Sequence, residues 1–246
     1  MVQVLVALGG NLGDVPDQFR HALNVLSDGP DLQVCQVSGI YRTAPVGAAA
    51  GNAYYNAAIS CDTILTAECL LDRLQDAELR AGRTREIHWG PRTLDLDLIA
   101  YGDSLIQTSR LTVPHPAAWY RRFVLDPVCE FAGDTPHPQF DVTWQALRRR
   151  LLARPLPVTI SGGTSETRAQ VALTLSGEFP VARLYPQAST GGMHIWLGAA
   201  DEESSTPPDL AVDGSRWGAD TLAQARFVLM STLDSPERIG DWSVAV

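Results

Sequence analysis

Two aspartates, Asp95 and Asp97, are the residues whose type and spacing most clearly indicate chemistry. They alternate with Leu94, Leu96 and Leu98, a period of two that predicts a β-strand with one apolar and one acidic face. On such a strand the two carboxylates lie about 6–7 Å apart and repel each other. A divalent cation relieves the repulsion, and Mg²⁺ commonly binds one or two carboxylates together with phosphate oxygens. The pair therefore predicts a magnesium–phosphate site.

A cationic and aromatic stretch comes just before this strand. Arg83, Arg85 and Arg92 offer forked donors for phosphate oxygens, and Trp89 offers a flat ring. A solvated strand face beside a charged loop is the alternative, and it would be favoured for the Asp-Leu-Asp pattern alone. The Gly-Pro-Arg sequence at 90–92 and the other two arginines favour a site for a metal-bound polyphosphate and a planar ring.

The composition limits the other chemistry that is available. The chain has 246 residues, 45% of them hydrophobic, and its net charge of −9 argues against a general affinity for nucleic acid or acidic membranes. All 19 basic residues are arginines, which excludes a Walker A lysine, a Schiff-base lysine and a lysine nucleophile. The cysteines lack Cys-x-x-Cys spacing and no apolar stretch has the length of a membrane span, so we expect a cytoplasmic protein.

The elements that would position the site follow the order β-α-β-β-α-β. Apolar or alternating runs predict strands over residues 2–8, 34–41, 54–61 and 94–101. Residues at helical spacing predict two intervening helices, the second capped by Thr66 and ending near residue 81. A further strand over 110–116 and a last helix over 142–152 follow. This order favours an α+β fold, with a ferredoxin-like, four-stranded antiparallel sheet that has helices on one face.

Beyond residue 154 the sequence changes character. Pro155-Leu156-Pro157 predicts a linker, and residues 158–163, followed by a helical stretch over 165–175, mimic a phosphate loop that no lysine completes. Short strands near 194–198 and 210–212 and a helix over 219–233 follow. We therefore divide the chain into residues 1–154 and a small C-terminal α/β appendage of unknown type, residues 155–246. The appendage is a candidate for packing on the first domain, for self-association or for a degenerate nucleotide-binding domain.

The first domain resembles one family along most of its length. Residues 89–98, Trp-Gly-Pro-Arg-Thr-Leu-Asp-Leu-Asp-Leu, are similar almost letter for letter to the signature of the 6-hydroxymethyl-7,8-dihydropterin pyrophosphokinases of folate biosynthesis. Further blocks resemble the family in the same order: residues 7–14, 41–47, 54–58, 111–116 and 121–125. Because the blocks are collinear, the resemblance is more specific than any single motif.

The resemblance implies an ATP-dependent diphosphotransferase that moves pyrophosphate from ATP to the pterin hydroxymethyl group and releases AMP. It implies two Mg²⁺ ions on Asp95 and Asp97, with Arg83, Arg85 and Arg92 completing the catalytic group. The implied pterin-side residues are Thr43, Pro45, Tyr54, Asn56, Trp89 and Phe123. The implied ATP-side residues are Gln75, Glu78, Arg83, Arg85, Trp89, Arg92, Leu98, Arg110, Thr112, His115 and Arg121. The expected partners are thus small-molecule substrates, without nucleic acid or membrane.

Two other function classes stay open on the residues alone. A metal-dependent sugar transferase also uses an Asp-x-Asp pair, but it does not account for Asn56, Phe123 and the Pro114-His115 block together. A non-catalytic pterin- or nucleotide-binding module has no need of two mutually repelling carboxylates. The sequence departs from the family pattern in a shorter arginine loop and at four residues: Gly10, Ala44, Glu86 and Arg122.

Overall fold

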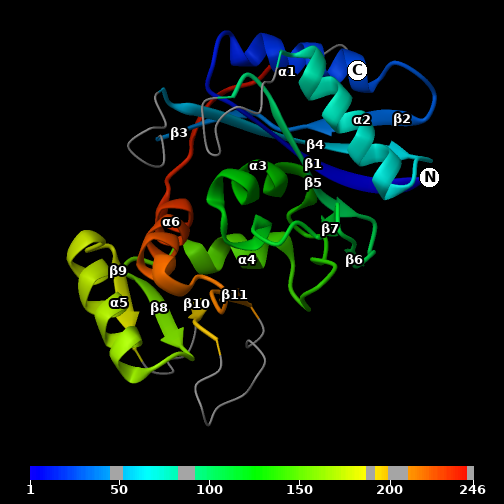
Figure 1. Ribbon diagram of the computed structural model, residues 1–246. Coiled ribbons are helices and arrows are strands. Elements are labelled where there is room, and N and C mark those ends of the chain that lie inside the picture. Colours follow the sequence, from blue (N-terminus) through cyan, green and yellow to red (C-terminus); the bar gives the residue numbers. More distant parts are fainter. Residues whose placement is uncertain (45–51, 83–91, 187–191, 199–209, 243–246) are drawn as a thin grey trace. The chain divides into compact units, whose positions relative to one another are not determined.

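The computed structural model describes residues 1–44, 52–82, 92–186, 192–198 and 210–242, and Figure 1 shows its helices and strands. The chain forms two compact units. Unit 1 combines residues 1–145 with residues 234–246, and unit 2 is residues 146–233. Along the sequence, unit 2 is therefore inserted between two segments of unit 1.

An antiparallel sheet forms the centre of unit 1, and its described part has six strands in the order β12-β3-β4-β1-β5, with β2 also paired to β4. The strands are β1 (Val2–Gly10), β2 (Leu32–Val37), β3 (Ile40–Thr43), β4 (Tyr54–Thr63), β5 (Asp95–Tyr101) and β12 (Glu237–Gly240). The predicted count of four strands is therefore wrong. The strand expected over 34–41 is divided at Ser38 and Gly39, because Ala58 N–H donates to Ser38 Oγ in place of a main-chain carbonyl. The sequence pattern also did not predict β12.

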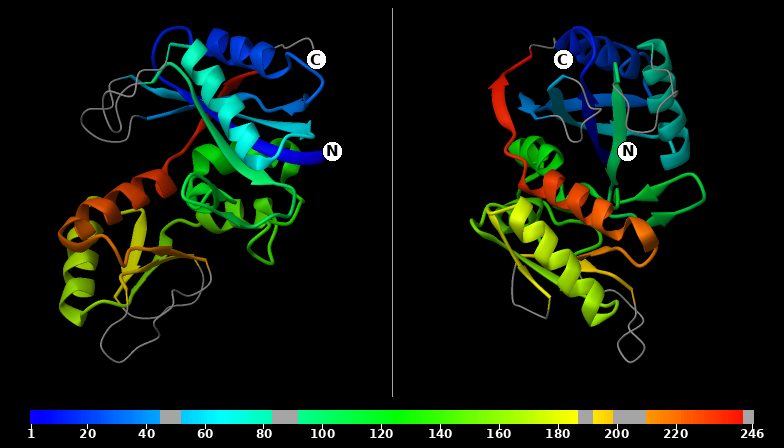
Figure 2. Two further views of the ribbon diagram at one scale, coloured as in Figure 1. Left: turned by 45° about the vertical axis from the view of Figure 1, so that its right-hand side comes forward. Right: turned by 60° about the vertical axis from the view of Figure 1, so that its left-hand side comes forward.

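Helices cover both faces of this sheet, as Figure 2 shows for α1, α2 and α3. Helix α1 (Val15–Leu26) begins at the cap Asp14, and α2 (Ala67–Arg80) begins at Thr66, whose hydroxyl accepts from Cys69 N–H as predicted. Their apolar residues pack on alternate residues of β1: Val4, Val6 and Leu8. Helix α3 (Arg122–Ala132) contacts β4, β3 and β1. The expectation of helices on one face is therefore wrong, because the intervening residues Leu5 and Ala7 of β1 are apolar and buried as well.

Short elements complete unit 1. The strand expected over 110–116 is only β7 (Thr112–Val113), which pairs with β6 (Ile106–Gln107), and the 3-10 helix Ala118–Tyr120 leads into α3. Helix α4 (Trp144–Leu151) lies where a last helix was predicted, and it carries the chain from unit 1 into unit 2.

Unit 2 has a parallel sheet whose described part contains four strands in the order β11-β10-β8-β9. The strands are β8 (Leu156–Ser161), β9 (Ala182–Tyr185), β10 (Met193–Trp196) and β11 (Ala211–Asp213). The helices are α5 (Ser165–Glu178) and α6 (Thr221–Leu233), with a 3-10 turn at Gly218–Asp220. Among the described residues of the whole chain, no helix is both long enough and apolar enough to span a membrane.

His137 gives unit 1 an expected sensitivity to acid. The ring stacks on Phe140 and packs against Trp144, with centroid distances of 4.6 and 4.5 Å, and burial lowers the pKa of His137 to about 4. In the unfolded chain the imidazole of His137 takes up a proton near pH 6.5. The free energy of unfolding should therefore fall as the pH drops from about 6.5 to about 4, by roughly 2–3 kcal/mol.

Urea unfolding at pH 7 and at pH 4.5 checks this prediction. His137→Phe should lose less stability on acidification than the unchanged protein, because it has no buried imidazole to protonate. His21→Gln, on the exposed surface of α1, is the control and should behave like the unchanged protein. Equal acid losses in all three proteins would contradict the assignment.

Candidate active site

Asp95 and Asp97 lie on the face of β5 that is opposite to its apolar face. The apolar side is buried in the core with α1 and α2 through Leu94, Leu96 and Leu98. Strand alternation turns both aspartates the other way. On the neighbouring strand β1, Gly9 is paired with Asp95 and Ala7 with Asp97. The predicted arrangement of two acids on one strand face is thus confirmed.

The repulsion between the two carboxylates favours binding of a divalent cation. Burial raises the pKa of Asp97, and the carboxylate of Asp95 raises it further, whereas His115, Arg121 and Arg92 act in the opposite direction. A cation bound by the two carboxylates would remove the penalty for charging both. No group of three or more His, Cys, Asp or Glu side chains in the described ranges is arranged as a metal site. An ion held by this pair would take its other ligands from water and phosphate oxygens.

Arg92 ties the start of β5 to the turn after β1. Its guanidinium forms an ion pair with Asp95, and its main-chain N–H donates to Asn11 Oδ1 at 2.8 Å. Asn11 N–H donates in return to the carbonyl of Arg92 at 2.9 Å. A Cβ at Gly10 would lie 2.6 Å from the carbonyl oxygen of Thr93, so the close approach requires glycine. Sequence reasoning gave Asn11 no role, although the Gly-Gly-Asn turn was the available signal.

Thr43, Tyr54 and Asn56 form a second group beside the carboxylates. Asn56 is buried on β4, and its Nδ2 donates to Thr43 Oγ1 on β3 at 3.1 Å. A Cβ added at Gly9 would lie 3.7 Å from Asn56 Oδ1 and 3.9 Å from Asp95 Cβ, so this glycine sits between the amide and the acidic pair. Burial raises the pKa of Tyr54, and the charges of Arg92 and Asp95 act on it in opposite directions. The amide and the carboxylates therefore share one face of the sheet.

His115 approaches the acidic pair from the turn after β7. Its main-chain N–H donates to the carbonyl of Ile99 at 2.9 Å, and Ala117 N–H donates to its Nδ1 at 3.2 Å. Burial lowers the pKa of His115, although the nearby charge of Asp97 raises it. A neutral ring with Nδ1 as an acceptor carries its proton on Nε2, so the imidazole is a neutral hydrogen-bond donor.

Arg121 brings a positive charge and a ring to the same face. It directly precedes α3, and its charge acts on Asp97. Its guanidinium carbon lies 5.7 Å from the ring centroid of Phe123 and 5.9 Å from that of Tyr120. The described site thus contains two carboxylates, a buried amide, a neutral imidazole, two guanidinium groups and aromatic rings.

Other residues expected on the ATP side lie outside this group. The side chain of Leu98 is in the core, on the opposite face from Asp97. Glu78 is buried, and its Oε1 accepts from Leu96 N–H at 2.8 Å, so it holds α2 against β5. Arg110 is exposed and pairs with Asp72.

Gln75 is partly exposed on α2, and Thr112 is exposed in β7. Four of the expected site residues lie outside the described residues: Pro45, Arg83, Arg85 and Trp89.

A family model provides the first comparison with known proteins. The model for 7,8-dihydro-6-hydroxymethylpterin-pyrophosphokinase (HPPK) matches residues 5–133, a range that includes both aspartates, Asn56 and Phe123. The chain belongs to the HPPK family. The family expected from the sequence is confirmed, and the matched part of the chain, residues 5–133, is an ATP-dependent transferase. The activity that this membership supports is pyrophosphate transfer from ATP to the hydroxymethyl group of 6-hydroxymethyl-7,8-dihydropterin, in folate biosynthesis.

Individual relatives agree with the HPPK assignment. A 2-amino-4-hydroxy-6-hydroxymethyldihydropteridine pyrophosphokinase of Pseudomonas aeruginosa is 41% identical over 139 residues, which are 56% of this chain and 86% of that protein. The enzyme of the same name from Haemophilus influenzae is 36% identical over 149 residues, 61% of this chain and 93% of that protein. The bifunctional protein FolKE of Lactococcus lactis is 39% identical over 134 residues, 54% of this chain, and the chain covers only 38% of its length.

A solved structure supports the fold. A Plasmodium falciparum HPPK-DHPS structure aligns with a TM-score of 0.51 at 11% sequence identity, covering 92% of this chain and 59% of that chain. At this identity the likeness concerns the fold alone.

Proposed function

We propose that Asp95 and Asp97 hold two Mg²⁺ ions during pyrophosphate transfer from ATP to the pterin. The observation that carries this proposal is the placement of both carboxylates on one face of β5, with Arg92 paired to Asp95 and the charge of Arg121 acting on Asp97. When bound, the ions would neutralise phosphate charge and bring the attacking hydroxyl and the triphosphate together.

The buried amide of Asn56 would recognise the amide edge of the pterin ring. Thr43 fixes one amide donor of Asn56, which orients the group before substrate arrives. Tyr54 would lie beside the ring, and Phe123 would stack on it. A buried polar group that pairs with the heterocycle gives discrimination against rings without the matching edge.

The cationic groups would bind the triphosphate. Arg92 and Arg121 have forked donors that suit phosphate oxygens, and His115 would donate from Nε2 as a neutral ring. The pterin hydroxymethyl oxygen would then attack the β-phosphorus of ATP and lose its proton to solvent, while the bond from that phosphorus to the AMP oxygen breaks and AMP leaves. The protein contributes positioning and stabilisation of charge.

The roles proposed for the remaining site residues rest on the resemblance to the HPPK family. It supports Arg83 and Arg85 as catalytic arginines, Trp89 beside both substrates and Pro45 on the pterin side. On the ATP side it supports Gln75, Glu78, Leu98, Arg110 and Thr112. A cytoplasmic location, a ferredoxin-like description of the sheet, a C-terminal α/β appendage and its self-association also stay proposals. The division expected at residue 154 differs from the two compact units, of which the second is residues 146–233.

Identifying the nucleotide product tests the function. The full chain is incubated with ATP, Mg²⁺ and 6-hydroxymethyl-7,8-dihydropterin, and the products are separated by chromatography. We expect AMP and pterin diphosphate in equal amounts. ADP would indicate an ordinary kinase, and the absence of any nucleotide product would indicate a binding module.

A further inference from the structure

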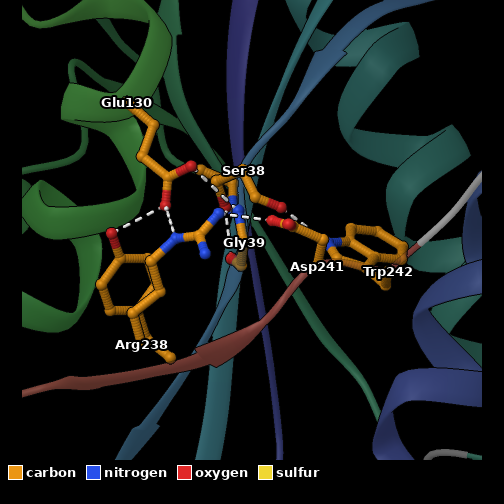
Figure 3. Close-up of polar contacts among 8 residues, drawn as sticks. Ser38, Gly39, Glu130, Arg238, Asp241 and Trp242 are labelled. Atoms are coloured by element: carbon orange, nitrogen blue, oxygen red, sulfur yellow. Dashed lines mark hydrogen bonds and ion pairs between the residues drawn. The ribbon is translucent and has the colours of Figure 1, made fainter.

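The last described part of the chain, residues 234–242, returns to unit 1 after the insertion of unit 2. We name these residues the return segment. Its strand β12 pairs antiparallel with β3, with Glu237 opposite Arg42 and Arg238 opposite Tyr41. Figure 3 shows the polar contacts of Arg238, Asp241 and Trp242 with Glu130, Ser38 and Gly39. β3 is the strand that ends at Thr43, on the pterin side of the site.

On the α3 side, Glu130 joins β12 to β3. Its Oε1 accepts from Tyr41 Oη at 2.7 Å and from Arg238 Nε at 3.0 Å, and its Oε2 accepts from Gly39 N–H at 3.1 Å. Although burial by itself would raise the pKa of Glu130, these three hydrogen bonds lower it overall. Arg238 also pairs with Asp241. One carboxylate of α3 therefore holds β3 and the return segment together.

On the core side, Trp242 holds the same stretch of chain. Its ring is buried 5.5 Å from that of Phe19, and its Nε1 donates to the carbonyl of Ser38 at 2.7 Å. The guanidinium of Arg238 lies so close to Gly39 that an added Cβ would be 2.7 Å from it. The junction between β2 and β3, Ser38-Gly39, is thus fixed from both faces of the sheet.

The beginning of the return segment contacts the other element of the pterin side. Arg122 donates from Nη1 to the carbonyl of Asp234 at 3.1 Å and forms a buried ion pair with Asp126 at 2.6 Å. Arg122 lies between Arg121 and Phe123 in sequence, and it is a departure from the family pattern. The return segment therefore contacts the start of α3 through Asp234 and pairs with Ile40, Tyr41 and Arg42 of β3.

We propose that the return segment is a positioning element for the pterin site, acting through the contact of Arg238 with Glu130. It sets the place of β3, and through Thr43 it sets the orientation of the Asn56 amide. This inference rests on the proposed pterin-binding role of Asn56. The competing explanation is that β12 only covers the edge of the sheet, which would affect stability alone.

Steady-state kinetics of the full chain separate the two explanations. Arg238→Met removes the guanidinium and keeps most of the apolar stem. We expect the KM for the pterin to rise about tenfold, because small misplacements of binding groups have effects of this size, while kcat and the KM for ATP change less than about twofold. Arg238→Lys, which retains a donor toward Glu130, should restore part of the affinity.

Arg226→Met is the matched control. Arg226 makes a two-point ion pair with Glu178 in unit 2, at 2.6 and 2.7 Å, and is exposed to a similar degree. Its pterin KM should equal that of the unchanged protein. The inference is wrong if Arg238→Met lowers the melting temperature but leaves the pterin KM unchanged. It is also wrong if Arg238→Met and Arg226→Met raise the pterin KM equally. An unchanged protein that forms no AMP would instead refute the proposed function.

Tyr41→Phe supplies an independent perturbation of the same cluster, because it removes only the hydroxyl that donates to Glu130. If both residues act by placing β3, the double variant Tyr41→Phe/Arg238→Met should raise the pterin KM by less than the product of the two single effects. Fully multiplicative effects would contradict a shared route. Titration with the pterin in the presence of a non-hydrolysable ATP analogue compares the pterin affinities of the same variants without turnover.

Discussion

Replacing Asp97 with asparagine is expected to lower kcat at saturating ATP and pterin by a factor of about 10³ or more, since losing charge stabilisation in a transition state commonly costs this much. The side chain faces the proposed metal site, and its neighbours Leu96 and Leu98 keep the core intact on the other face. Stability should not fall, because burial and Asp95 both disfavour the charged form of Asp97. Initial rates and thermal melting measure the two effects separately.

Asp103→Asn is the control for this substitution. Asp103 is exposed in the turn that follows β5, so the same chemical change there should leave kcat within about twofold. If Asp97→Asn retained more than a tenth of the activity, the metal would have to be held elsewhere. If Asp97→Asn lost both its activity and its folded state, Asp97 would have a structural role and not the proposed role of a metal ligand.

Replacing Asn56 with alanine is expected to raise the KM for the pterin about 100-fold, since leaving polar groups of a buried site unpaired costs roughly 1–3 kcal/mol for each group. The amide is buried next to Gly9 and donates to Thr43, so its removal leaves the Thr43 hydroxyl without this hydrogen bond. The KM for ATP should stay within about twofold, because the amide is proposed to contact the pterin and not the nucleotide. Kinetics with each substrate varied in turn provide the measurement.

Asn24→Ala, on the exposed surface of α1, is the matched control and should leave both KM values unchanged. Equal increases in the KM for pterin and for ATP would mean that Asn56 supports the whole sheet. An unchanged pterin KM would show that the heterocycle is recognised elsewhere.

The sequence signals that predicted the structure correctly are local ones. The alternation from Leu94 to Leu98 was enough to place Asp95 and Asp97 on one strand face, because side chains of a strand point to opposite faces in turn. Thr66 was identified as a helix cap from its place before an apolar helical repeat, and the structure confirms the hydrogen bond. The family was identified from blocks that occur in the same order, and the family model confirms it.

Features that join distant residues were not predicted. Arg42 and Glu237 pair although they are 195 positions apart, and nothing in either local sequence indicates the other. The family resemblance placed Glu78 on the ATP side, and nothing in the local sequence indicated that its buried carboxylate accepts from Leu96 N–H of β5. Arg122 was noted only as a departure from the family pattern, and nothing in the sequence indicated that it is buried and paired with Asp126.

The sequence by itself thus determined the type of β1, β4, β5 and α2, the face that carries the acids, and the family, but it did not predict helix α3. Only the tertiary structure decided the sixth strand, the second covered face of the sheet, and the contacts of Glu130, Arg238 and Trp242 with β3 and the Ser38-Gly39 junction. The physical reason is that periodicity and capping depend on residues a few positions apart. Strand pairing and buried ion pairs depend instead on which distant segments the whole fold brings together.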